Sequence, residues 1–473
     1  MASLASVKEL LNRHGQRHLL AFYGELPRPQ RQGLLKQIAS IDFVRLDALI
    51  RSHVLVKPPV HIPEDLQPAP IRPACPADEA TRSAYAEGRR AGERLIADGK
   101  VAATVVAGGA GTRLGFDGPK GCLAVTPVKR KSLFRVFAEQ ILATSRRYGS
   151  AVPWYVMTSP DNDAATREFF DEHEFFGLPP ADVFFFTQGQ MPAIDAKGRI
   201  LLAEKDRIAW SPDGHGGSLS ALRNSGALDD MARRGVEHIS YFQVDNPLVR
   251  CVDPLFIGLH AAAGAGMSAK ALPKREPTEK VGNFCLADGK VTVIEYSDLP
   301  EELAYATNDD GRLRFNAGSI AIHVLSRTFV EELTQGGSCR LPFHRAEKAV
   351  PYVDPAGNKV TPETPNAFKL EMFIFDAIPL AEAAVVLETV RSEEFSPVKN
   401  ASGHDSVATC LHDQIRRAAD WLETVGITVP RDAERDFAAA VEISPLFALE
   451  PGDLIGKIDP AMTIRPEQEV YLE

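Results

Sequence analysis

The loop from residue 105 to 121, VVAGGAGTRLGFDGPKG, follows an apolar run and combines glycines with two cations. Gly108, Gly109 and Gly111 have no side chain, so their backbone amides can approach a polyanion closely. Arg113 and Lys120 add fixed positive charge within the same loop. This combination predicts a site for a phosphate-rich ligand, and the alternative is a tight turn between a strand and a helix.

The glycine spacing matches neither standard nucleotide fingerprint. The dinucleotide pattern GxGxxG fits at Gly109 and Gly111, but Leu114 stands where the third glycine is required. The GxxxxGK[ST] phosphate loop is also absent from this stretch. The interpretation of the chain as an NAD-dependent oxidoreductase therefore depends only on a partial motif match and on the fold pattern.

Two further polar residues stand where a site would need them. Asp245 directly follows the apolar run ISYFQV, so its carboxylate is expected at the end of a strand. In open α/β sheets, ligands bind beyond the carboxyl ends of the strands. Lys399 lies in EFSPVKN, whose Ser-Pro surroundings predict a loop that can move when a site closes.

The elements that must position these residues follow an α/β pattern. After residue 100, short apolar runs alternate with helical patterns, one of which is capped by Ser132 and stopped by Gly149. This βαβαβ series predicts a parallel sheet covered by helices, with mixed strands further on. The expected strands cover residues 101–106, 152–158, 183–187, 238–243, 291–297 and 314–324.

The chain divides into three expected regions. Residues 1–99 form an N-terminal helical region that is interrupted by a proline-rich connector at 55–76. Residues 100–385 form the catalytic domain, and residues 386–473, with short strands and turns, form a small β-rich C-terminal domain.

Composition excludes several functional classes. The 473 residues are 44% hydrophobic, which suits large globular cores, and the net charge of -10 argues against binding nucleic acid through a general basic field. No apolar run is long enough to cross a membrane, and the charged N-terminus is unlike a signal peptide. The six cysteines form no CxxC pair, so we expect no zinc site and a cytoplasmic protein.

Several motifs together resemble one family. The loop AGGAGTRLGFDGPKG resembles the signature of the eukaryotic-type UDP-sugar pyrophosphorylases, most closely of the branch that acts on UDP-N-acetylglucosamine. In the family's order there follow FFFTQGQMPA, SPDGHGG, VDNPLVRCVDPLFIG, VIEYSDLP, FNAGSIAIH, VPYVD, PNAFKLEMFIFD and EFSPVKNA. The resemblance covers most of residues 85–450 and implies a Rossmann-like (GT-A-like) nucleotidyltransferase fold.

The resemblance implies a Mg²⁺-dependent uridylyltransferase. It would form UDP-N-acetylglucosamine and pyrophosphate from UTP and N-acetylglucosamine-1-phosphate, both of them small molecules, by in-line attack on the α-phosphate. Arg113 and Lys120 resemble the family's triphosphate-binding pair, Asp245 its magnesium ligand, and Lys399 the lysine that reaches the sugar phosphate. Such catalysis consists mostly of positioning and charge neutralisation.

Further binding residues are carried over from the family. Gln188 has an amide that can both donate to and accept from the uracil edge. The other expected nucleotide contacts are Ala107, Gly108, Gly109, Gly111, Gly214 and His215. The expected sugar contacts are Gly282, Glu295, Tyr296, Asn316, Phe373 and Phe375.

Two positions leave the sugar open. His215 stands where the family's N-acetylglucosamine enzymes usually carry asparagine, and Ser319 also departs from the usual asparagine. A UDP-glucose or broad-specificity UDP-sugar pyrophosphorylase is therefore the alternative enzyme. A non-catalytic nucleotide-sugar-binding protein is an alternative of another class, although it would not need Arg113, Lys120, Asp245 and Lys399 together. The sequence does not determine the oligomeric state.

Overall fold

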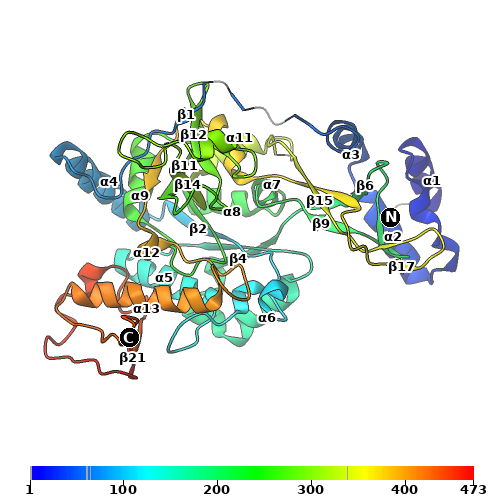
Figure 1. Ribbon diagram of the computed structural model, residues 1–473. Coiled ribbons are helices and arrows are strands. Elements are labelled where there is room, and N and C mark those ends of the chain that lie inside the picture. Colours follow the sequence, from blue (N-terminus) through cyan, green and yellow to red (C-terminus); the bar gives the residue numbers. More distant parts are fainter. Residues whose placement is uncertain (1–2, 60–61, 64, 338) are drawn as a thin grey trace. The chain divides into compact units, whose positions relative to one another are not determined.

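The computed structural model describes residues 3–59, 62–63, 65–337 and 339–473 (Figure 1). The chain forms two compact units, and each is built from segments that are far apart in the sequence. Unit 1 contains residues 1–61, 188–218 and 340–376, and unit 2 contains residues 62–187, 219–339 and 377–473. The N-terminal helices therefore belong to the same unit as residues 188–218 and 340–376. A division of the chain into consecutive regions does not describe this grouping.

The core of unit 2 is a ten-stranded mixed sheet with the path β1-β12-β14-β10-β2-β3-β4. Strands β10, β2, β3 and β4 are parallel neighbours, and β14 runs antiparallel to β10. The predicted α/β class with a mixed sheet is thereby confirmed. The strands of this sheet are β1 (Gln67–Pro68), β2 (Val101–Val106), β3 (Trp154–Thr158), β4 (Val183–Thr187), β10 (His238–Gln243), β11 (Met267–Pro273), β12 (Asn283–Ala287), β13 (Lys290–Ile294), β14 (Ala317–Ser326) and β19 (Val386–Glu388).

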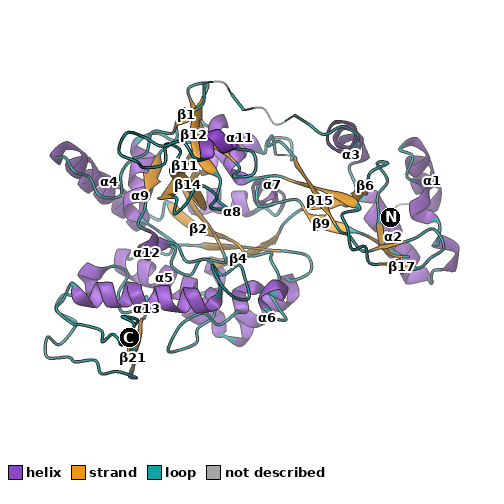
Figure 2. Cartoon of the chain, viewed as in Figure 1, coloured by secondary structure: helices purple, strands orange, loops and turns teal. Residues whose placement is uncertain are grey.

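Successive side chains of a strand point to opposite faces of the sheet. Helices pack against the side chains on both faces. Trp154 on β3 packs in one cluster with Phe134 of α5 and Phe256 of α9. The next residue, Tyr155, donates to Asp230 of α8 over 2.7 Å. The helices of unit 2, shown in purple in Figure 2, are α4 (Glu79–Ala97), α5 (Leu133–Tyr148), α6 (Asp163–Glu172), α8 (Ala227–Arg234), α9 (Pro254–Ala262), α10 (Glu301–Ala304), α11 (Arg327–Leu333), α12 (Arg391–Glu394) and α13 (Val407–Glu423).

The helix caps expected from the sequence are present. The Ser132 side chain accepts from the N–H of Arg135 at the start of α5, and Gly149 ends the helix in the left-handed region at φ +70°. Among the described residues no helix is long and apolar enough to cross a membrane.

The C-terminal segment differs from the predicted β-rich domain. Its largest element is the helix α13, which begins with a capping box at Ser406 and buries Trp421 and Leu422. The strands beyond α13 are β20 (Ala440–Ile443) and β21 (Glu469–Leu472), a parallel pair that packs with α13 in one apolar cluster. The helix forms because residues 407–423 have helical spacing, and it comes in addition to the short strands that were expected in this segment.

Unit 1 combines helices with small sheets. Its helices are α1 (Leu4–Arg13), α2 (Arg28–Ala39) and α3 (Phe43–Leu49), which confirms a helical N-terminus. Helix α7 (Gly217–Asn224) begins at the end of the middle segment of unit 1. The strands are β5 (Gln190–Pro192), β6 (Ile194–Asp195), β7 (Leu202–Glu204), β8 (Arg207–Ile208), β9 (Trp210–Pro212), β15 (His344–Lys348), β16 (Tyr352–Val353), β17 (Lys359–Val360) and β18 (Ala367–Glu371).

Candidate active site

The glycine-rich loop folds back on itself at the carboxyl end of β2. The N–H of Gly111 donates to the carbonyl of Gly118 over 2.9 Å, and the N–H of Lys120 donates to the carbonyl of Gly109 over 3.1 Å. These bonds return Lys120 to the strand end from which the loop departs. A Cβ atom on Gly111 would lie 2.7 Å from the Phe116 ring, so glycine is required by packing there.

The strand end leaves backbone donors available. Within the described chain, the N–H groups of Gly108 and Gly109 have no hydrogen-bond acceptor. Asn162 supports the loop from behind, because its side-chain amide donates to the carbonyl of Ala107 over 3.0 Å. Sequence reasoning missed Asn162, although SPDN directly after the neighbouring strand β3 was a signal for a second polar strand end.

Four charged residues predicted from distant segments gather at this end of the sheet. Lys120 Nζ lies 3.7 Å from Asp245 Oδ2, and both side chains are largely buried. The pKa of Lys120 is lowered, mainly by burial and further by the positive charges of Lys399 and Arg113, while Asp245 opposes the shift. The structure thus brings Arg113, Asp245 and Lys399 within electrostatic reach of Lys120.

Backbone contacts fix the segment that carries the predicted lysine. The N–H of Val398 donates to the carbonyl of Asp245 over 2.8 Å. The Asn246 side chain donates to the carbonyl of Glu394 over 2.7 Å and accepts from the N–H of Ser396 over 3.0 Å. These three bonds hold residues 394–398 in a fixed position relative to residues 245 and 246 at the end of β10.

A buried ion network anchors the same segment. Lys270 on β11, which is 1% exposed, lies 2.6 Å from both Asp253 and Glu394. Arg250 adds a second cation 3.3 Å from Glu394. The sequence analysis did not identify this network, since its members come from three separate segments, namely β11, α12 and residues 250–253.

The predicted sugar contacts of unit 2 lie at the start of β14. A Cβ atom on Gly282 would lie 3.5 Å from Glu295 Oε1, and the N–H of Ser319 donates to the Gly282 carbonyl over 2.7 Å. Asn316 uses its side-chain oxygen to accept from the N–H of Lys274 over 2.9 Å. Tyr296 is 43% exposed. Because β14 runs antiparallel to β10, its first residues lie toward the end of the sheet at which β10 finishes.

The remaining predicted contacts form a second group inside unit 1. The His215 ring stacks on Phe373 at 5.4 Å and lies 5.9 Å from the Phe375 ring. Burial lowers the pKa of His215 to about 4, with a smaller contribution from His344. The N–H of Ile374 donates to Nδ1 of His215 over 3.2 Å, so Nε2 carries the proton of the neutral ring.

Three residues that the sequence analysis did not predict also belong to this group, namely His344, Asp376 and Asp213. His344 also stacks on Phe373, at 4.4 Å, and its Nε2 lies 2.7 Å from Asp376. Asp213 is buried against Gly189 and Gly217, and burial raises its pKa to about 6. Gln188 is buried beside this turn. The motif SPDGHGG was recognised, but the buried role of its aspartate has no signature in a single sequence.

Comparison with known proteins identifies the family. Residues 69–415 match the family described as UTP–glucose-1-phosphate uridylyltransferase. The chain belongs to this family. The predicted resemblance to UDP-sugar pyrophosphorylases is therefore confirmed.

The family includes relatives that are similar over almost the whole chain. A human protein named UDP-N-acetylhexosamine pyrophosphorylase-like protein 1 is 40% identical over 95% of this chain and 93% of its own length. A Schizosaccharomyces pombe protein named probable UDP-N-acetylglucosamine pyrophosphorylase is 37% identical over 90% of this chain and 93% of its own. The solved UDP-N-acetylglucosamine pyrophosphorylase of Trypanosoma brucei, in complex with an inhibitor, is 26% identical, covers 100% of this chain and 99% of its own, and has a TM-score of 0.81.

The strand end at Asp245 can be tested for its fit to the magnesium ion that the sequence analysis expects. In the described chain no group of three or more His, Cys, Asp or Glu side chains could enclose a metal. Asp245 offers one carboxylate at the end of β10. Magnesium is often held by one or two carboxylates together with substrate phosphates, so this donor set fits such an ion.

Proposed function

We propose that this chain is a uridylyltransferase that forms UDP-N-acetylglucosamine and pyrophosphate from UTP and N-acetylglucosamine-1-phosphate. The observation that carries the proposal is Lys120, which lies beside Asp245 beyond the carboxyl ends of β2 and β10 and within electrostatic reach of Arg113 and Lys399. A binding protein without turnover has no need to concentrate cations where a triphosphate would be cleaved. The family and the names of its relatives support the same activity.

The reaction forms one P–O bond and breaks another. A phosphate oxygen of the sugar phosphate attacks the α-phosphorus of UTP, and the bond to the β-phosphate oxygen breaks to release pyrophosphate. The nucleophile is already an anion, so positioning and charge neutralisation supply the catalysis. Arg113 and Lys120 stabilise the triphosphate and the departing pyrophosphate, while Lys399 orients the sugar phosphate.

We further propose that Asp245 holds a magnesium ion. Such an ion, when bound, neutralises charge on the phosphate oxygens as a Lewis acid. The backbone amides of Gly108 and Gly109 add donors that need no reorganisation during the reaction.

In our proposal, Gln188 and the 214–217 turn recognise the uracil. The aromatic group of His215, Phe373 and Phe375 offers an apolar surface that suits an acetyl group. The same histidine favours the second candidate, a UDP-glucose or broad-specificity enzyme, because it stands where the family's N-acetylglucosamine enzymes usually carry asparagine.

The assay that tests the proposal measures pyrophosphate release from UTP with four sugar-1-phosphates. We expect N-acetylglucosamine-1-phosphate to give the highest kcat/KM, ahead of N-acetylgalactosamine-1-phosphate, glucose-1-phosphate and galactose-1-phosphate. A preference for glucose-1-phosphate of about tenfold, or about 1.4 kcal/mol in transition-state binding, would overturn the sugar assignment. Absence of pyrophosphate release with all four would overturn the activity.

We also propose a cytoplasmic location. All six cysteines are free in the structure, as a reducing compartment would keep them. Fractionation of the source cells with an antibody to the chain would test this location.

A further inference from the structure

A cavity of about 420 Å³ lies in unit 2 beside the segment that carries Lys399. Its volume is within the range of roughly 300–1,000 Å³ that is common for small-molecule sites. None of the predicted site residues is among the described residues that line it. The lining includes three arginines and two histidines, namely Arg275, Arg391, Arg416, His404 and His412.

One wall of the cavity has more positive than negative charge. Arg391 is paired with Glu279 over 2.7 Å, and the backbone N–H of Arg275 donates to the other oxygen of the same carboxylate over 2.7 Å. Burial lowers the pKa of Arg391, and the nearby charge of Arg275 adds to the shift. Within the described chain the Arg275 guanidinium has no carboxylate partner of its own. The Glu279 carboxylate therefore offsets only the charge of Arg391, and the neighbouring Arg275 guanidinium, which has no such partner among the described residues, favours a bound oxyanion.

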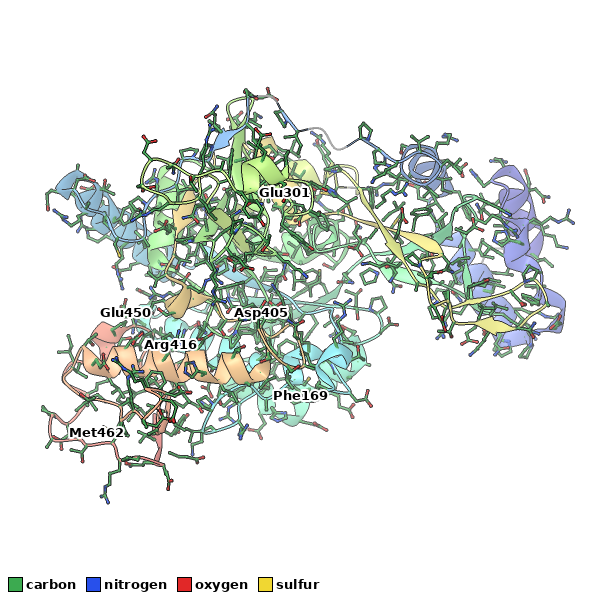
Figure 3. All side chains as sticks on the ribbon, viewed as in Figure 1. Phe169, Glu301, Asp405, Arg416, Glu450 and Met462 are labelled. Carbon is green, nitrogen blue, oxygen red and sulfur yellow. The ribbon has the colours of Figure 1, made fainter. Side chains whose placement is uncertain are left out.

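Other lining groups suit hydroxyls. Asp405 and Asp413 line the cavity, and Asp413 accepts from Ser396 Oγ over 2.7 Å. Arg416 on α13 lies 3.7 Å from Asp413, and Figure 3 labels Arg416 on that helix and Asp405 just before it. Ionised carboxylates only accept hydrogen bonds, so they pair with the hydroxyl groups of a ligand rather than with its phosphate.

We propose that this cavity is an effector site for a small phosphorylated sugar or polyol. The guanidinium groups of Arg275 and Arg391 bind the phosphate, while Arg416 donates to hydroxyls of the ligand and the carboxylates of Asp405 and Asp413 accept from them. The ligand is thus of the same chemical class as the sugar-phosphate substrate, but it occupies a separate place.

The cavity is connected to Lys399 through one residue. The carbonyl of Asp405 accepts from the N–H of Lys399 over 2.6 Å and from the N–H of Asn400 over 3.0 Å. Asp405 has φ +55°, a conformation that is uncommon outside glycine and stores strain. A ligand that contacts the Asp405 side chain therefore acts on the residue whose carbonyl fixes the backbone of Lys399. The expected effect of the ligand on turnover rests on the proposed function, whereas binding of the ligand to the cavity does not depend on that function.

Calorimetry with glucose 6-phosphate tests binding, since this ester has a phosphate and hydroxyls. We expect Arg275→Ala and Arg416→Ala each to weaken binding at least about tenfold, which is about 1.4 kcal/mol. Arg312→Ala is the matched control, because Arg312 is 80% exposed and lies outside the lining. We expect Lys399→Ala to retain binding. Loss of binding in Lys399→Ala, or unchanged binding in both cavity variants, would overturn the site, and equal affinity for inorganic phosphate would overturn the ligand class.

Turnover supplies the second measurement. With both substrates saturating, glucose 6-phosphate should change the rate of the unmodified protein at least twofold. Arg275→Ala and Arg416→Ala should keep the basal rate but lose this response. A response that persists in both variants, or no response where calorimetry shows binding, would overturn the effector role. Failure of the proposed function would instead abolish turnover and leave the calorimetric result intact.

Discussion

Lys120 and Asp245 face each other across the strand ends of β2 and β10, with Nζ and Oδ2 3.7 Å apart. Separate segments hold the two groups, since Lys120 lies on the glycine-rich loop after β2 and Asp245 lies just beyond the end of the neighbouring strand β10. Arg113 and Lys399 are close enough to affect the pKa of Lys120. Three cations and one carboxylate at this place have a net positive charge that a triphosphate and its metal would balance.

The first prediction concerns the charge of Lys120. Lys120→Ala should lower kcat about 10²–10³-fold, the usual cost of removing one donor that stabilises transition-state charge. Lys100→Ala is the control, since Lys100 forms a surface ion pair with Glu237. Steady-state pyrophosphate release measures both. A loss confined to KM would show that Lys120 binds substrate and transition state equally.

The second prediction concerns pH. The lowered pKa of Lys120 means that the free protein loses this charge at a lower pH than an ordinary lysine would. The kcat/KM for UTP, which reports the free enzyme, should therefore decline on the alkaline side below pH 10.5. Lys120→Arg should remove this decline, even if its maximum is lower, because arginine does not titrate there. An identical alkaline decline in both proteins would assign it to another group.

The third prediction concerns the metal. Asp245→Asn should raise the magnesium concentration for half-maximal turnover at least about tenfold, because a neutral amide binds a divalent ion more weakly. Asp117→Asn is the matched control, since Asp117 is an exposed acid on the glycine-rich loop. Chelation by EDTA should abolish turnover of the unmodified protein. Turnover of Asp245→Asn with unchanged magnesium dependence would contradict the assignment.

The fourth prediction separates two glycines of one loop. A Cβ atom on Gly109 would meet no neighbouring group within 4 Å, whereas a Cβ atom on Gly111 would lie 2.7 Å from Phe116. Gly109→Ala should keep its stability but bind UTP more weakly, because the methyl group keeps phosphate from the backbone. Gly111→Ala should lose about 1–3 kcal/mol of stability through overpacking. Urea unfolding and UTP titration distinguish the two effects.

The sequence predicted the elements whose signals are local. Ser132 and Gly149 bounded α5 correctly, and the apolar runs placed β2, β4 and β10. Asp245 could be expected at a strand end because an apolar run precedes it. Its distance from Lys120 could not, since that depends on the hydrogen bonds that close the glycine-rich loop.

The features that could not be predicted from the sequence depend on packing between distant segments. Lys270 resembles any lysine until the fold buries it between Asp253 and Glu394. The grouping of residues 340–376 with the N-terminal helices likewise follows from contacts between distant segments. Helix α13 was missed because turn residues on both sides concealed its period.

The fifth prediction concerns the buried network beside the site. Lys270→Met removes the partner of two buried carboxylates, so it should destabilise unit 2 by about 3–5 kcal/mol. Lys270→Met combined with Glu394→Gln should lose less than the sum of the single variants, because the uncompensated charge is removed. Lys131→Met is the matched control, since Lys131 forms a buried pair with Glu139 at another place. Both single variants should be destabilised in urea, but we expect kcat of the folded protein to fall further for Lys270→Met, whose network holds the segment before Lys399.

Steady-state kinetics of the same variants, together with their stability in urea, decides whether the network positions the site. If kcat falls equally in Lys270→Met and Lys131→Met at equal stability, Lys270 contributes to folding alone. A conservative Lys270→Arg variant should restore part of the stability and of kcat, because its guanidinium can still pair with Asp253 and Glu394. The bonds from Asn246 to residues 394 and 396 give the physical reason, since a displaced Glu394 carries the following segment away from Asp245.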